Sequence, residues 1–256
     1  MGLSKIVIGA VAATTLVTGT PTAQAAGTVQ TTPTALTKKS KQKWTQTKKA
    51  GRKAMRAALK DAQATSASVA LVSGGKTVWS RTFGRVNTAG KKPSDTTKFG
   101  IGSVGKMVTT TEVMQSVDAG KISLDAPVVQ YVPDFSMKSP QYRQITVRML
   151  LNHSAGLPGT DYADSISSQP IPSYVDGVLA GLANSHLKTT PGAMNVYCND
   201  CFTLAGVVVE RVSGMPFQDY VKSNILKPLR MRHSSYPTSV PTPGTMAPII
   251  QDGKVQ

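Results

Sequence analysis

The sequence predicts a fold of the α/β class in which a sheet-bearing part is followed by a mainly helical part. Residues 46–84 combine one helical pattern with two short alternating segments joined by glycines, whereas residues 103–235 show a succession of helical patterns separated by turns. A hairpin followed by a run of helices is typical of a protein whose sheet and helices are segregated. At 256 residues, the chain is long enough for one sizeable domain or two small ones.

Residues 1–25 have the pattern of a secretory signal peptide. Lys5 supplies a short positive start, an apolar run follows, and Ala23-Gln-Ala25 matches a small-x-small cleavage site. A membrane anchor is the weaker interpretation, because the run is too short to span a bilayer. No later stretch approaches the roughly 18 apolar residues of a membrane span. We therefore expect a secreted, extracellular protein.

Positive charge is concentrated near the N-terminus. The net charge is +16, and ten of the 29 Lys and Arg residues lie between Lys38 and Lys60, where no acidic residue occurs. Residues 26–45 are rich in Thr and Lys, which predicts a disordered linker. Residues 46–62 place Ala, Met and Leu against Lys and Arg at helical spacing, which predicts a helix with a narrow apolar face.

The basic segment Lys38–Lys60 has two interpretations, a solvated tether or a binding site for an anionic partner. An anionic cell-wall polymer, a membrane surface and nucleic acid would all be attracted by its charge. Nucleic acid is the weakest of these, because an export signal precedes the segment and only Trp44 could stack on a base.

A β-hairpin is predicted after the basic helix. Ser68–Ser73 and Lys76–Gly84 are joined by Gly74-Gly75, a pair that suits a two-residue hairpin turn. Turn residues dominate the following loop.

Helical patterns dominate the rest of the chain. The helix from Ser103 is expected to end near Gly120, and the helix from Asp200 at Gly214, because Gly favours the conformation that closes a helix. Shorter helices are predicted over residues 124–133, 145–152, 172–184 and 217–226. The domain organisation expected is a signal peptide at 1–25, a linker at 26–45 and one domain at 46–256, divided into helix and hairpin (46–100), a helical part (103–235) and a loop (236–256).

Ser103 and Lys106 form the first candidate catalytic pair. The chain contains four Ser-x-x-Lys strings, and only this one opens a helix after a strand-like segment; the others are Ser40/Lys43, Ser73/Lys76 and Ser185/Lys188. Residues three apart share a helix face, and a helix N-terminus favours negative charge. This arrangement suits a nucleophile with an amine base and a developing oxyanion. The alternative is an N-cap serine with a solvated lysine.

Tyr197 and Asn199 form the second candidate pair. They make the only Tyr-x-Asn in the chain, directly before a predicted helix, so both side chains can project the same way from an extended segment. A phenol beside an ammonium group loses its proton more readily, and an amide can hold a substrate carbonyl. The alternative is a buried tyrosine followed by a turn-forming asparagine.

Cys198 and Cys201 are the only two cysteines. In an oxidising compartment a disulfide is permitted, and two free thiols remain an equal alternative. Zinc is disfavoured, because two ligands are too few and no other His or Cys pair completes a site.

Together these segments resemble the serine β-lactamase and D-alanyl-D-alanine carboxypeptidase superfamily, in its class C-like branch. The resemblance covers about residues 48–250. Besides Tyr197-Cys-Asn199, the matching segments are 69–84, 99–106, 120–128, 145–158, 191–192 and 227–231.

The resemblance implies a serine hydrolase that forms an acyl-enzyme. Ser103 would be the nucleophile, Lys106 its proton acceptor, Tyr197 the group that protonates the leaving group, and Asn199 the group that orients the substrate amide. Peptides of the D-Ala-D-Ala type, β-lactams and small esters are the implied substrates, and no metal or other cofactor is needed. His153 falls in a matching loop and is interpreted as structural. We expect a bacterial, monomeric protein.

Three departures from the family pattern affect these expectations. After Asn199 there is no Lys-x-Gly or His-x-Gly, and Gln256 ends the sequence where the family continues with three strands and a terminal helix. We therefore expect a C-terminally truncated fold that folds poorly and hydrolyses slowly, or a non-catalytic homologue attached to the wall by its basic segment. Cys198 replaces the usual Ser or Ala, and Arg230 replaces the usual Gly.

Overall fold

The computed structural model describes residues 44–86, 90–160, 171, 173–239, 245–248, 250–251 and 254–255. They fall into two compact units, one drawn from Met1–Thr97 with Ala247–Gln256 and the other spanning Lys98–Met246. The predicted signal peptide and almost all of the predicted linker lie outside the described residues. Within the part that is described, no helix is both long enough and apolar enough to cross a membrane.

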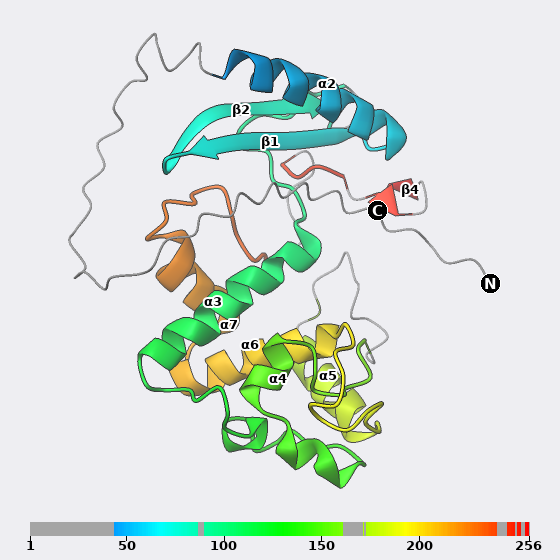
Figure 1. Ribbon diagram of the computed structural model, residues 1–256, viewed down its shortest axis with the longest axis vertical. Helices are drawn as coiled ribbons and strands as arrows, with labels where there is room; N and C mark the ends of the chain where they lie inside the picture. Colours follow the sequence, from blue (N-terminus) through cyan, green and yellow to red (C-terminus); the bar gives the residue numbers. More distant parts are fainter. Residues whose placement is uncertain are drawn as a thin grey trace. The chain divides into compact units, whose positions relative to one another are not determined.

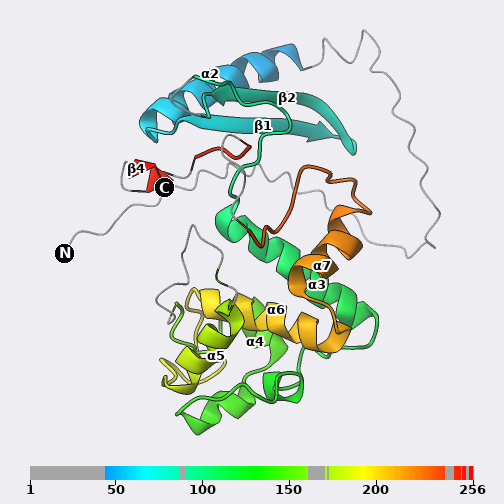
Figure 2. The same ribbon diagram turned by 180° about the vertical axis from the view of Figure 1, so that it is seen from behind.

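The first unit combines one helix with a β-hairpin, as predicted (Figures 1 and 2). Helix α2 (Thr45–Asp61) lies along the antiparallel strands β1 (Ser66–Ser73) and β2 (Lys76–Gly84). Gly74 and Gly75 form the turn with φ angles of 57° and 68°, the left-handed conformation that a two-residue hairpin turn of this kind requires. A second two-stranded sheet is made by β3 (Ile250–Gln251) and β4 (Lys254–Val255).

Gly51 allows α2 to approach the hairpin closely. A Cβ atom at this position would lie 2.8 Å from the Trp79 ring, closer than side chains pack. The Arg52 guanidinium lies 5.9 Å from the centre of the same ring, within the range of a cation–π contact. The helix therefore turns its half-buried side toward β2 and leaves its other sides in solvent.

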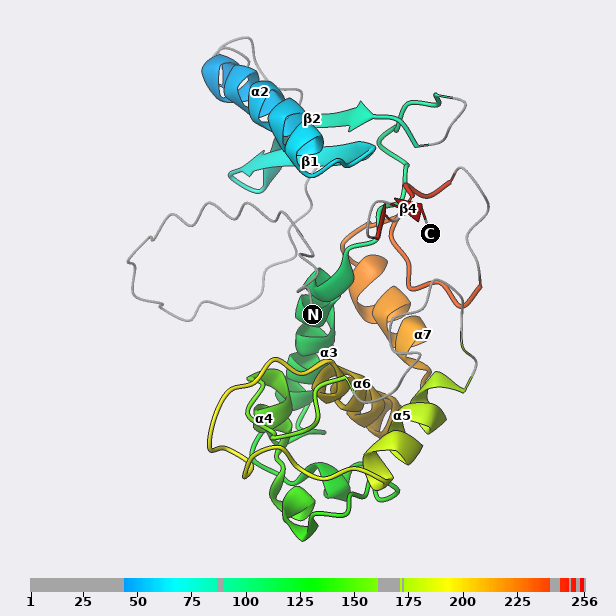
Figure 3. The same ribbon diagram turned by 90° about the vertical axis from the view of Figure 1, so that its right-hand side faces the viewer.

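The second unit is mainly helical (Figure 3). Its elements are the 3₁₀ turn η1 (Gly102–Val104), α3 (Gly105–Asp118), the 3₁₀ turns η2 (Val128–Gln130) and η3 (Pro140–Gln144), α4 (Val147–Leu151), α5 (Tyr174–Ala183), α6 (Asn199–Ser213), α7 (Phe217–Val221) and the π-helical turn η4 (Lys222–Leu226). Gly120 and Gly214 have φ angles of 69° and 68° just beyond α3 and α6, as expected of glycines that end helices.

Two helix boundaries differ from the prediction. Ser103 lies in the 3₁₀ turn before α3, because Gly102 has a φ of 50° that an α-helix does not accommodate. The helix expected over residues 124–133 is reduced to the 3₁₀ turn η2, which begins after Pro127. Short connecting segments commonly adopt this tighter helix.

The core of the second unit surrounds α6. This helix packs against α3, α4, α5 and α7, and most of its middle is buried (Figures 1 and 3). Large side chains with almost no exposed surface come from several of these helices and include Val113, Leu150, Leu182, Leu204 and Val208. Burial of this kind stabilises a fold by about 25 cal/mol for each Å² of apolar surface. It also holds the first turn of α6 beside the start of α3.

Glu112 on α3 is a buried carboxyl within this core. It has no exposed surface, and neither carboxyl oxygen forms a hydrogen bond with any described residue. Burial, with a smaller contribution from the negative charge of Glu210, raises the pKa of Glu112 from 4.5 to about 8. The carboxyl is therefore protonated in the folded protein at neutral pH, because an isolated buried charge is costly.

We expect the free energy of unfolding to fall as the pH rises between about 5 and 8. In this window the folded protein keeps the Glu112 proton while the unfolded chain releases it. Each rise of one pH unit therefore lowers the free energy of unfolding by up to about 1.4 kcal/mol. Glu112→Gln should remove most of this slope and leave the variant more stable than the parent at pH 8. Urea unfolding of both proteins at several pH values measures the free energy of unfolding and its slope against pH.

Asp118→Asn is the matched control, because Asp118 is an exposed acid on the same helix. This variant should keep the slope of the parent protein. Equal slopes for Glu112→Gln and the parent would contradict the assignment.

Candidate active site

Ser103 and Lys106 meet at the start of α3. Lys106 lies in the first turn of α3, and its Nζ donates a hydrogen bond to Ser103 Oγ over 3.1 Å. Ser103 does not cap α3, because the flanking residue is Val104 and no side chain makes a capping bond there. The three-residue spacing therefore brings a hydroxyl and an amine together, as the helix geometry predicts.

Tyr197 and Asn199 reach the same place from the segment that precedes α6. Tyr197 Oη lies 2.5 Å from Ser103 Oγ, and Lys106 Nζ donates to Asn199 Oδ1 over 2.7 Å. Cys198, between them, has an extended backbone, so its two neighbours project to the same side. Tyr197 is 56% exposed, which excludes the alternative of a buried tyrosine. Lys106 thus contacts the other three candidate residues, and Tyr197 also contacts Ser103.

The positive charge of Lys106 acts on Tyr197. Its Nζ lies 4.8 Å from the centre of the phenol ring. Partial burial by itself raises the pKa of Tyr197, but the interactions with Lys106 and with the Ser103 hydroxyl outweigh it and bring the pKa below its ordinary value. The phenol is therefore adapted to give up and take back a proton beside Ser103.

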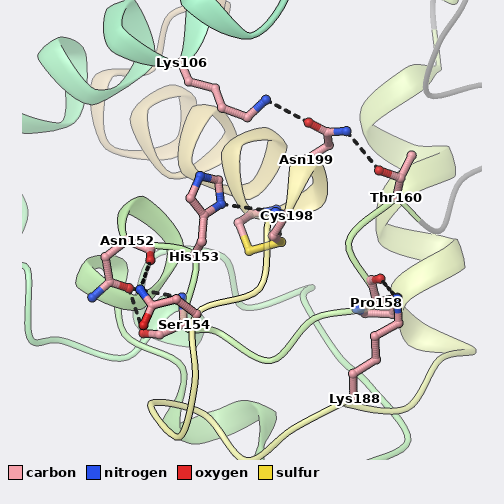
Figure 4. The surroundings of a disulfide bond; sticks show 11 residues. Lys106, Asn152, His153, Ser154, Pro158, Thr160, Lys188, Cys198 and Asn199 are labelled. Carbon is pink, nitrogen blue, oxygen red and sulfur yellow. Dashed lines mark hydrogen bonds between the residues drawn. A yellow bond between two sulfur atoms is a disulfide. The ribbon is translucent and has the colours of Figure 1, made fainter. Parts of the chain in front are cut away.

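Gly159 and Thr160 hold Asn199 from the other side (Figure 4). Asn199 Nδ2 donates to Thr160 Oγ1 over 2.9 Å, and the backbone N–H groups of Asn199 and Asp200 both donate to the Gly159 carbonyl, over 2.7 and 3.0 Å. Lys188 Nζ donates to the Pro158 carbonyl in the same loop. Sequence reasoning missed Thr160, because it lies 39 residues from Asn199 and carries no motif of its own.

His153 supports the tyrosine instead of contacting Ser103. Its Nδ1 accepts a hydrogen bond from the Cys198 backbone N–H over 3.1 Å (Figure 4). Its ring lies 4.8 Å from that of Tyr197. Burial first, and then the charge of Lys106, lower the pKa of His153. The ring is therefore neutral near pH 7, with its proton on Nε2. These contacts agree with the structural role expected for His153.

The chain also matches the model of a known protein family. The family model described as Beta-lactamase matches residues 52–249. The chain belongs to the beta-lactamase family. This membership confirms the expected β-lactamase/transpeptidase-like fold of the α/β class and places the chain among beta-lactamase-like serine hydrolases.

Two curated proteins are similar to part of this chain. Protein flp from Staphylococcus aureus (strain COL) is 29% identical over 173 residues, which cover 66% of this chain and 34% of that protein. The probable hydrolase M10 from Phoma sp. is 26% identical over 206 residues, covering 67% and 35%. The chain thus spans about a third of the length of the curated relatives that it matches.

Two solved structures are similar in fold as well as in sequence. The octameric penicillin-binding protein homologue from Pyrococcus abyssi has a TM-score of 0.59 and 27% identity, covering 70% of this chain and 42% of that chain. A D-stereospecific amidohydrolase from Streptomyces sp. has a TM-score of 0.54 and 28% identity, covering 66% and 51%.

In this member of the beta-lactamase family, a disulfide bond encloses Asn199. Cys198 and Cys201 are bonded, with an S–S distance of 1.98 Å, which resolves the choice between a disulfide and free thiols. Cys198 Sγ also accepts the Cys201 backbone N–H over 3.0 Å, so it caps the N-terminus of α6. Nowhere in the described residues does a group of three or more His, Cys, Asp or Glu side chains form a possible metal site.

We expect loss of the disulfide to destabilise the protein moderately. A cross-link that closes so short a loop contributes about 2 kcal/mol in the chain-entropy account. Dithiothreitol, or the double variant Cys198→Ala/Cys201→Ala, should therefore lower the melting temperature by several degrees, as followed by circular dichroism.

The double variant Cys198→Ser/Cys201→Ala separates the cap from the cross-link. A serine hydroxyl can replace the sulfur as the N-cap acceptor, so this variant should be about 1 kcal/mol more stable than the double alanine variant. Equal melting temperatures for the two variants would show that the cap contributes nothing.

Proposed function

We propose that this protein is a secreted serine hydrolase that forms an acyl-enzyme on Ser103. The observation that carries the proposal is the position of Ser103 Oγ, which lies 3.1 Å from Lys106 Nζ and 2.5 Å from Tyr197 Oη. A hydroxyl with an amine and a phenol in hydrogen-bond reach is an activated nucleophile. Secretion is supported by the signal-peptide pattern of residues 1–25.

The contacts support the following order of proton transfers. Lys106 passes a proton to the Tyr197 phenolate and accepts the Ser103 proton in its place as Oγ attacks the carbonyl carbon of the substrate. The tetrahedral intermediate then collapses, the bond to the leaving group breaks, and Tyr197 gives that group a proton. Water attacks the resulting ester by the reverse proton transfers, which releases the acid and regenerates Ser103.

The backbone at Ser103 can stabilise the negative charge that forms on the carbonyl oxygen. Its N–H lies in η1, at the N-terminal end of α3, and makes no hydrogen bond that the described residues reveal. N–H groups at the start of a helix favour an anion, and this one would supply half of an oxyanion hole.

Asn199 is proposed to orient the substrate amide. Its Oδ1 is held by Lys106, and one proton of Nδ2 is donated to Thr160. The second Nδ2 proton can still be donated to a substrate carbonyl, because an amide nitrogen has two donors. We propose peptides of the D-Ala-D-Ala type, β-lactams or small esters as substrates, in line with the similarity to a penicillin-binding protein homologue and a D-stereospecific amidohydrolase.

Incubation with a fluorescent penicillin or a fluorophosphonate should label Ser103. Mass spectrometry of the digested protein should find the adduct on the peptide that contains Ser103, and Ser103→Ala should abolish it. Tyr197→Phe should slow labelling by about 100-fold or more, the range of general acid–base catalysis.

Ser73→Ala is the matched control, because Ser73 belongs to another Ser-x-x-Lys string but lies at the end of β1. It should be labelled at the rate of the parent protein. Equal labelling of Ser103→Ala and the parent, or no adduct on Ser103, would favour a non-catalytic protein.

We also infer that α2 binds an anionic cell-wall polymer, because its exposed cations are aligned. Lys49, Lys53, Arg56 and Lys60 are exposed and recur at intervals of four, three and four residues, which places them on one side of the helix. The stripe is roughly 17 Å long at 1.5 Å per residue. No member of it pairs with a carboxylate among the described residues. An extended polyanion suits such a linear array.

Binding of polyglycerol phosphate should weaken as salt rises. Lys53→Ala/Lys60→Ala should reduce the slope of log affinity against log salt by about 1.5, as expected when two phosphate contacts are lost. Fluorescence anisotropy measures the affinity at salt concentrations from 50 to 200 mM. Affinities that depend on phosphate contacts change strongly over this range. The control Lys121→Ala/Lys138→Ala removes two cations from the other unit and should leave the slope unchanged. An affinity that does not depend on salt would contradict an electrostatic role for α2.

A further inference from the structure

A pocket of about 600 Å³ in the second unit lies outside the proposed catalytic group. Its wall is built from Lys98 before η1, from α7 and η4, and from the loop at 227–238. None of the four proposed site residues lines it. Its volume is in the range of pockets that bind small molecules.

Positive charge dominates the wall of this pocket. Five Lys or Arg side chains line it against one acid, Asp219; they are Lys98, Lys222, Lys227, Arg230 and Arg232. All five are exposed, and in the described parts of the chain none of them forms an ion pair with a carboxylate. Cations gathered around one hollow without acidic partners repel one another, and an anion bound there would relieve that repulsion.

Arg230 occupies a backbone position that is costly for an arginine. Its φ is 55°, in the left-handed region where glycine is the favoured residue. It ends the helical segment that runs through η4, with its N–H donating to the Lys227 carbonyl over 3.0 Å. A strained residue at a pocket suggests that its side chain has a use, because the backbone alone would favour glycine.

Interaction with the helix dipole does not explain why all five cations line the pocket. Cations near the C-terminal end of a helix stabilise that helix, and this explanation suffices for Lys227 and Arg230. Lys98 precedes η1, more than 100 residues earlier in the sequence, and Arg232 lies beyond the helix end. What unites all of them is the pocket.

We propose that this pocket binds an anion that carries two or more phosphate groups. Arginine presents a planar fork of donors that matches phosphate oxygens, and lysine adds a compact positive charge. A pocket of this volume with five cations has room and charge for more than one phosphate. The phosphates can belong to a small polyphosphorylated compound or to a phosphodiester chain, which share this chemistry.

Calorimetric titration of the whole chain carrying Lys53→Ala/Lys60→Ala, which weakens binding at α2, with tripolyphosphate, glycerol phosphate oligomers and orthophosphate tests the proposal. Tripolyphosphate or the oligomer should bind at least tenfold more tightly than orthophosphate, and the tighter of the two identifies the kind of ligand. Arg230→Gly should weaken that binding about tenfold, as expected for one lost charge-assisted contact. The same variant should melt a few degrees higher without ligand, because glycine relieves the backbone.

Lys138→Ala is the control, since it removes an exposed cation elsewhere in the same unit. It should leave the affinity unchanged, and labelling of Ser103 should be unaffected in both variants. The proposal is overturned if orthophosphate binds as tightly as the multivalent anions. It is also overturned if Arg230→Gly and Lys138→Ala weaken binding equally, which is the behaviour of a general positive surface.

Discussion

The ammonium group of Lys106 is the interaction on which the candidate site depends. It donates to Ser103 Oγ and Asn199 Oδ1 and lies over the Tyr197 ring. These contacts join the start of α3 to the start of α6, which are more than 90 residues apart in the sequence. One charge therefore holds the Ser103 hydroxyl and the Asn199 amide and lowers the pKa of the neighbouring phenol.

Packing of α6 makes this junction possible. The helix is buried among α3, α4, α5 and α7, so its first turn has a fixed position relative to α3. The extended segment before it is then held by His153, by the Gly159 carbonyl and by the disulfide of Cys198 and Cys201. A rigid helix with a tied entry segment is what a catalytic constellation needs, because small displacements of the reacting groups are costly.

Charge is distributed unevenly over the described residues. Carboxylate partners occur in the two ion pairs Arg148–Asp125 and Arg211–Asp134, both on the surface of the second unit. The cations of α2 and of the pocket at Arg230 have no such partners where the structure describes the chain. The buried carboxyl of Glu112, in contrast, is neutral because burial raises its pKa to about 8.

Local features of this protein were determined by the sequence alone. Paired glycines set the hairpin turn at Gly74-Gly75, Gly120 and Gly214 mark the ends of α3 and α6, and a three-residue spacing brings Ser103 to Lys106. Each of these depends on the conformational preference of a few neighbouring residues. The ordered motifs also led to the family that the comparison confirmed.

Tertiary structure decided what the spacing of residues could not. It placed Tyr197 and Asn199 against Lys106, added Thr160 to the group, joined Cys198 to Cys201, and gathered Lys98 with Arg230 at one pocket. It also places Ser103 in a 3₁₀ turn and not in the α-helix that the sequence predicted. Contacts between distant segments depend on how helices pack around a shared core, and that packing is a property of the whole unit, which no short stretch of sequence encodes.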